Sequence, residues 1–120
     1  MMIQVNTDRH VTGDATLTER VAASMEQVLH RFRNDITRLE VHLGDENSLK
    51  SGAADKRCMI EARVEGQRPM AVTHHAASLD DAIGGAADKM KSALESALGK
   101  LREQRGRPGP SGDDESGLER

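Results

Sequence analysis

The sequence is poor in aromatic side chains, cysteine and long apolar runs. It has no Trp, no Tyr and one Phe among 120 residues, so its core must be built from aliphatic side chains, Met and Ala. The single Cys58 excludes an internal disulfide and suits a reducing compartment, so we expect a cytoplasmic protein. The N-terminal residues lack the apolar stretch of a signal peptide, and no run has the length of a membrane span.

An excess of positive charge is also missing. The chain has 17 Lys and Arg against 20 Asp and Glu, a formal net charge of −3. The last fifteen residues, 106–120, contain four acidic and two basic side chains and so account for two of these negative charges. A general attraction to polyanions is therefore excluded, and any nucleic-acid binding must use a local patch of Lys and Arg.

The C-terminal segment differs in composition from the rest of the chain. Residues 106–120 are rich in Gly, Pro, Ser and charge and cannot bury an apolar core. We predict one domain over residues 1–105, followed by a disordered tail over 106–120.

The first half of the chain alternates between two hydrophobic periods. Ile3 and Val5 alternate with polar neighbours and predict a strand of about five residues. From about Thr16 to Phe32, apolar residues recur every three or four positions, which predicts a helix. Residues 36–43 return to period two and predict a half-buried strand, followed by a polar loop over 44–55.

The second half predicts two more strands and a long helix. Residues 56–66 and 69–75 alternate and are joined by a tight connection, so the second to fourth strands should form an antiparallel meander. A helix should begin near Ser78, a good N-cap, and end near Arg105. The predicted fold class is α+β, in the order β-α-β-β-β-α. A four-stranded sheet would carry both helices on one face and leave the other face solvated.

Two adjacent glycines, Gly84 and Gly85, lie early in this long helix although glycine disfavours helix formation. The apolar stripe of this helix is Leu79, Ile83, Ala86, Met90, Leu94, Ala97 and Leu101. A helical projection places Gly85 on the face opposite this stripe and Gly84 just beside that opposite face, which predicts that packing on the sheet does not explain them. The face opposite the stripe would be small and partly acidic. It could form a shallow groove for another backbone, or it could be an exposed surface of low helix propensity. Its predicted members are Asp81, Gly85, Asp88, Ser92, Glu95, Ser96 and Gly99.

Charged residues should line the outer face of the sheet. We interpret them as a mutually paired, solvated surface, with an anion or partner site on Arg38, Arg57 and Arg63 as the alternative. No metal or cofactor site is predicted, because His74 and His75 should point to opposite faces of one strand. No enzyme motif and no small-molecule substrate site is recognised.

The order of elements, with "LTERVAASMEQVLHRF" and "AIGGAADKM", resembles the ribosome hibernation-promoting and ribosome-associated inhibitor family, also called ribosomal subunit interface proteins. The resemblance covers roughly residues 2–102. It implies a fold akin to double-stranded RNA-binding domains and a short-form, non-enzymatic factor. It also implies that the helices lie on the small ribosomal subunit, in the channel for messenger and transfer RNA. Occupying that channel would block translation and protect idle ribosomes under stress.

The resemblance also implies which residues contact ribosomal RNA. Several exposed positions that are typically basic in this family are uncharged here, namely Ser24, Gln27, Ser92, Ser96 and Leu98. The alternative to a ribosome-binding factor is a diverged protein-interaction or stress module with weak or no rRNA binding, which could form a homodimer through the second helix. The rRNA-binding candidates are Lys89, Lys91, Lys100, Arg102 and Arg105 on the second helix, with Arg20, Arg31 and Arg33 on the first.

Overall fold

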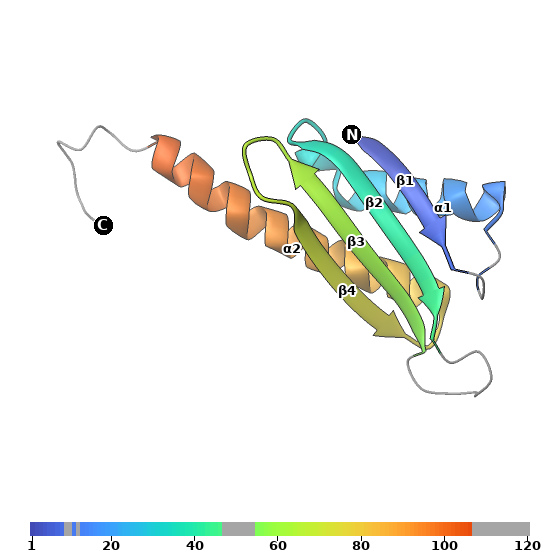
Figure 1. Ribbon diagram of the computed structural model, residues 1–120. Helices are drawn as coiled ribbons and strands as arrows, with labels where there is room; N and C mark the ends of the chain where they lie inside the picture. Colours follow the sequence, from blue (N-terminus) through green and yellow to red (C-terminus); the bar gives the residue numbers. More distant parts are fainter. Residues whose placement is uncertain (9–10, 12, 47–54, 107–120) are drawn as a thin grey trace.

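A computed structural model describes residues 1–8, 11, 13–46 and 55–106, with the side chains of 100–106 outside the described set. The elements follow the predicted order β-α-β-β-β-α, with one additional 3-10 turn, η1 (Figure 1). Their bounds are β1 Met2–Thr7, α1 Ala15–Val28, η1 His30–Phe32, β2 Ile36–Asp45, β3 Lys56–Val64, β4 Met70–Ala76 and α2 Leu79–Gly106.

The four strands form one sheet in the order β1-β2-β3-β4, and both helices cover the same face of it (Figure 1). β1 pairs parallel with β2 because the chain crosses over through α1, while β2, β3 and β4 form the predicted antiparallel meander. The register aligns Val5 with Val41, Val41 with Ile60, and Ile60 with Val72, so one apolar row runs across the whole sheet. That row faces the helices and contributes to the hydrophobic core.

The core is aliphatic, as the composition predicts. Phe32 is 1% exposed and packs with buried Leu, Ile, Val, Met and Ala side chains from both helices and the sheet. Cys58 is fully buried among them, in keeping with its interpretation as a small hydrophobe.

The first helix is shorter than predicted. The expected continuous helix to Phe32 is wrong, because α1 ends at Val28 and η1 follows. The Leu29 amide still donates to the Met25 carbonyl (2.9 Å), but the Phe32 amide donates to Leu29 (2.9 Å), which is three residues earlier. This tighter turn buries both Leu29 and Phe32. At the other end, Asp14 caps the helix by accepting a hydrogen bond from the Leu17 amide (2.8 Å).

The second helix begins where predicted, since the Ser78 hydroxyl accepts from the Asp81 amide at 3.1 Å. Its buried face is centred on the predicted stripe but is wider, because it also includes Ala82, Ala87 and Leu98. Leu98 is 4% exposed, so placing it among the exposed, typically basic positions was wrong. The projection left out Ala82 and Ala87 because alanine adds little to an apolar stripe yet packs closely on a sheet.

The wider buried face changes the interpretation of the two glycines. Gly84 is exposed, whereas Gly85 lies half-buried over His74 of β4. A Cβ on Gly85 would stand 2.6 Å from His74 Cγ and closer still to Cδ2 and Nε2 of the ring. The prediction that packing on the sheet explains neither glycine is therefore wrong for Gly85.

Two further boundaries differ from expectation. β2 continues to Asp45, two residues into the predicted loop, and β3 ends at Val64. Residues 107–120 of the predicted tail lie outside the described residues. Within the part of the chain that is described, no helix has the length and apolar content needed to cross a membrane.

Candidate functional site

The two helices lie together on the sheet and are joined by ion pairs at two points along their length. Arg20 of α1 pairs with Asp80 at the start of α2. Arg31 of η1 pairs with Glu95 of α2 at 3.1 Å and also lies over the Phe32 ring. All four charged side chains are more than 40% exposed, so each pair contributes at most about 1 kcal/mol and can exchange its partner.

A groove of about 350 Å³ runs between these helices. Its small side chains are Ala23 and Ser24 of α1, and Gly84 lies opposite them on α2. A Cβ on Gly84 would meet no atom within 4 Å, so the missing side chain leaves this surface open. Small residues on both helices thus make a shallow, accessible depression, which Arg20, Gln27, Asp80 and Ile83 complete.

The other predicted rRNA contacts are distributed unevenly. Lys89 donates to the Thr73 carbonyl of β4 at 2.8 Å, and Lys91 is half-buried on α2. Arg33 follows η1 instead of lying on a helix, a correction to its placement, and donates to the His30 carbonyl at 3.0 Å. The remaining candidates, Lys100, Arg102 and Arg105, lie within the backbone range of α2, and their side chains are outside the described residues.

Acidic side chains dominate the described helical surface. Among the described side chains of α1, η1 and α2, the exposed Lys and Arg residues are Arg20, Arg31 and Lys89. Positive charge in the sequence gathers later, because residues 100–107 hold four Lys and Arg and one Glu. Figure 1 shows α2 continuing past the sheet in this direction. The exposed acidic residues on the helices are Glu19, Glu26, Asp80, Asp81, Asp88 and Glu95.

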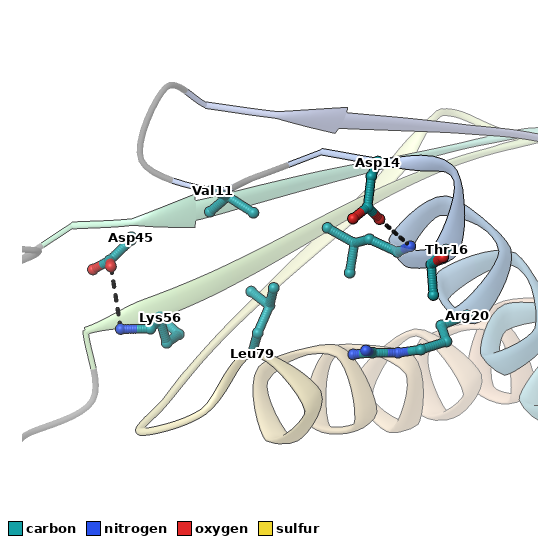
Figure 2. A pocket seen from close by; sticks show the side chains of 8 residues that line it. Val11, Asp14, Thr16, Arg20, Asp45, Lys56 and Leu79 are labelled. Atoms are coloured by element: carbon teal, nitrogen blue, oxygen red, sulfur yellow. Dashed lines mark hydrogen bonds and ion pairs between the residues drawn. The ribbon is translucent and has the colours of Figure 1, made fainter.

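A second cavity, of about 360 Å³, lies where α1 and α2 begin (Figure 2). Lys56 Nζ is 3.2 Å from Asp45 Oδ2, and this hydrogen bond raises the pKa of Lys56. Asp14 is occupied as the cap of α1, and Arg20 is paired with Asp80. Its charges are matched by neighbouring groups, so the cavity shows no preference for a charged ligand.

The sheet face away from the helices carries the predicted charge pairs. Arg38 Nε lies 3.0 Å from Glu40, and Glu46 lies within 3.2 Å of both Arg57 and His75. Arg38 is opposite Arg63 whereas Arg57 is opposite Gly44, so the structure does not gather the three arginines into one anion site. The face is better described as partly paired, because Arg38 and Arg57 have carboxylate partners and Glu61 has no ion pair within the described residues.

Sequence reasoning missed the pairs that connect the helices. Arg20 and Asp80 are 60 residues apart, and Arg31 and Glu95 are 64 apart. No spacing rule applies over such separations, since the sheet determines which helix faces meet. In the sequence, the glycine at position 84 was the residue that indicated a depression between the helices.

One comparison with known proteins identifies a family. The sequence model of the family described as Sigma 54 modulation protein / S30EA ribosomal protein matches residues 4–102. The chain belongs to this family. The match confirms the resemblance found in the sequence. No match is found among curated proteins.

Two solved structures confirm the fold. The N-terminal domain of Protein Y from Thermus thermophilus superposes with a TM-score of 0.64 at 18% identity, covering 80% of this chain and 98% of that one. A ribosomal subunit interface protein from Coxiella burnetii gives 0.63 at 19% identity, covering 82% and 99%. At these identities the likeness establishes the shared fold.

Proposed function

We propose that this protein is a non-enzymatic, cytoplasmic factor that docks its two-helix face on the small ribosomal subunit. There it would occupy the channel for messenger and transfer RNA, and so inhibit translation or protect idle ribosomes under stress. The observation that carries the proposal is the family match over residues 4–102, which includes α1, most of α2 and nearly all of the sheet that positions them.

The charge distribution indicates which part of this face would make the main electrostatic contacts with RNA phosphates. The described helical surface is mainly acidic, and the C-terminal part of α2 is basic in sequence. Lys100, Arg102 and Arg105 would therefore supply the main phosphate contacts. Lys89 and Lys91 would extend that patch along α2.

The arginines that join the helices can take part at small cost. Arg20 and Arg31 would exchange an exposed carboxylate for a phosphate, and such surface pairs are worth about 0 to 1 kcal/mol. Arg33 would exchange a backbone carbonyl in the same way. The exchange would leave the carboxylates of Asp80 and Glu95 unpaired next to the negatively charged RNA, which opposes it. We therefore expect Arg20 and Arg31 to contribute less to RNA affinity than the basic residues at the C-terminal end of α2.

Co-sedimentation with purified small subunits at low and moderate salt tests the proposal. We expect saturable, salt-sensitive binding of about one copy per subunit. Replacing Lys89 and Lys100 together with Ala should weaken binding and flatten the log-log salt dependence by about 0.7 to 0.9 per lost phosphate contact.

The matched control replaces Arg63 and Arg68 with Ala. Both are exposed, Arg63 lies on the opposite sheet face, and the change in net charge is the same. If the control weakens binding as much as the lysine pair, net charge and not the helical face is responsible. If wild-type protein fails to bind even at low salt, the proposal is wrong.

The small-residue groove between the helices favours a second candidate, a protein-interaction or stress module that pairs with itself through α2. Under this alternative the groove at Ala23, Ser24 and Gly84 would seat a helix of the second copy. Gly84→Leu would fill the groove, and light scattering should show loss of the dimer. A monomeric wild-type protein, or a dimer that Gly84→Leu leaves intact, would contradict it.

A further inference from the structure

Three side chains with metal-binding atoms meet on the sheet face that the helices leave uncovered. Glu40 and His42 are two residues apart on β2, and Glu61 of β3 is the direct cross-strand partner of Glu40. Their candidate ligand atoms all lie within 4.8 Å of one another, and each residue is half-buried. The pleat of the sheet thus brings two carboxylates and one imidazole to a single point.

The charges at this point are incompletely balanced. Like charges directly opposite each other on neighbouring strands destabilise a sheet. Glu40 Oε2 lies 3.0 Å from Arg38 Nε, while Glu40 Oε1 lies 3.5 Å from His42 Nε2. Glu61 has neither an ion pair nor a hydrogen bond within the described part of the chain. A half-buried carboxylate therefore faces a second carboxylate with an imidazole beside it and no cation of its own.

We propose that Glu40, His42 and Glu61 bind a divalent transition-metal ion, with Zn²⁺ as the representative case. Nitrogen and oxygen donors together suit zinc, whereas magnesium and calcium prefer oxygen ligands throughout. Three protein ligands leave the fourth position to water. Arg38 orients Glu40 without binding the ion itself, because its guanidinium lies beside Oε2 of Glu40 and leaves Oε1 facing the imidazole of His42.

The site is independent of the proposed ribosome contacts. The helices cover the opposite face of the sheet, and none of the three ligands belongs to the rRNA-binding set (Figure 1). Metal binding can therefore be measured on the full chain without ribosomes, and its outcome does not depend on the proposed function.

Calorimetric titration of metal-free protein with ZnCl₂ is the experiment. We expect one saturable site, and at least tenfold weaker binding in both His42→Gln and Glu61→Gln. The matched control is His75→Gln, which removes a half-exposed imidazole that also lies beside a carboxylate, Glu46 at 2.9 Å. The control should bind zinc like wild type. Far-UV circular dichroism of each metal-free variant verifies its fold.

Paramagnetic broadening of amide signals by Mn²⁺ or Co²⁺ locates the ion separately. We expect the broadening to centre on Glu40, His42 and Glu61. The proposal is overturned if wild type shows no saturable site, or if His42→Gln and Glu61→Gln bind zinc like wild type. Loss of affinity in His75→Gln, or broadening centred on another part of the chain, would also overturn it, because the ion would then occupy a different site.

Discussion

Replacing Gly85 with Ala tests how α2 packs on β4. The change adds one methyl group to a helix interior, which by propensity alone stabilises by about 0.8 to 1.0 kcal/mol. Here the new Cβ would stand 2.6 Å from His74 Cγ and would overlap the ring more severely at Cδ2 and Nε2. Overpacking of this kind costs about 1 to 3 kcal/mol. The net expectation is a loss of about 0 to 2 kcal/mol.

Gly84→Ala is the matched control, because it makes the same chemical change one residue earlier. Its Cβ would meet no atom within 4 Å, so the full propensity gain of about 0.8 to 1.0 kcal/mol should appear. The two variants should therefore differ by about 1 to 3 kcal/mol in urea unfolding. In thermal unfolding, each kcal/mol corresponds to about 4 to 8 °C for a domain of this size.

A double-mutant cycle with His74→Ala isolates the cause. With the imidazole ring removed, Gly85→Ala should become stabilising by about 0.8 to 1.0 kcal/mol, because the overlap is gone and the propensity gain remains. If Gly85→Ala stabilises the wild-type background as much as Gly84→Ala does, the close approach of α2 to His74 is refuted. If His74→Ala leaves the effect of Gly85→Ala unchanged, the imidazole is not the group that opposes it.

Three further perturbations test the core, one turn and the outer sheet face. Burial raises the pKa of the Cys58 thiol to about 12 from 9.0, so the native thiol should resist a thiol-reactive dye at pH 8. Because the thiol pKa is higher in the folded protein than in the unfolded chain, the protonated Cys58 contributes fully to the free energy of unfolding below about pH 9, and this contribution is lost as the pH rises toward 12. A urea midpoint that stays constant over that pH range would contradict the burial of the thiol. Gly66→Ala should lose about 1 to 2 kcal/mol in urea unfolding, because Gly66 adopts a φ of 78° in the β3–β4 turn, and an unchanged midpoint would argue against that conformation. Glu61→Gln should stabilise the metal-free protein by about 0.2 to 1 kcal/mol by removing repulsion from Glu40, whereas destabilisation would mean that the Glu61 carboxylate has a stabilising partner.

The candidate site was partly predictable from the sequence. Arg20, Arg31 and Lys89 could be named from the family resemblance, and each is exposed on the helical elements. That Arg20 and Arg31 pair with Asp80 and Glu95 could not be predicted, because each pair joins segments at least 60 residues apart. The juxtaposition of Glu40 with Glu61 likewise depends on strand register, which the connection between β2 and β3 and the packed face together determine.

The sequence by itself determined the element order, the inward face of each strand and the aliphatic core. Alternation in the strands and the three- and four-residue spacing in the helices are local properties, and the burial of side chains such as Val41 and Ile60 follows directly from them. The tertiary structure decided which edge of α2 comes closest to the sheet. That contact depends on which small side chains let the helix approach, and it places Gly85 against His74 while Gly84 is exposed. Alanine and glycine carry almost no hydrophobic signal in a sequence, so the contact between helix and sheet had to be seen in three dimensions.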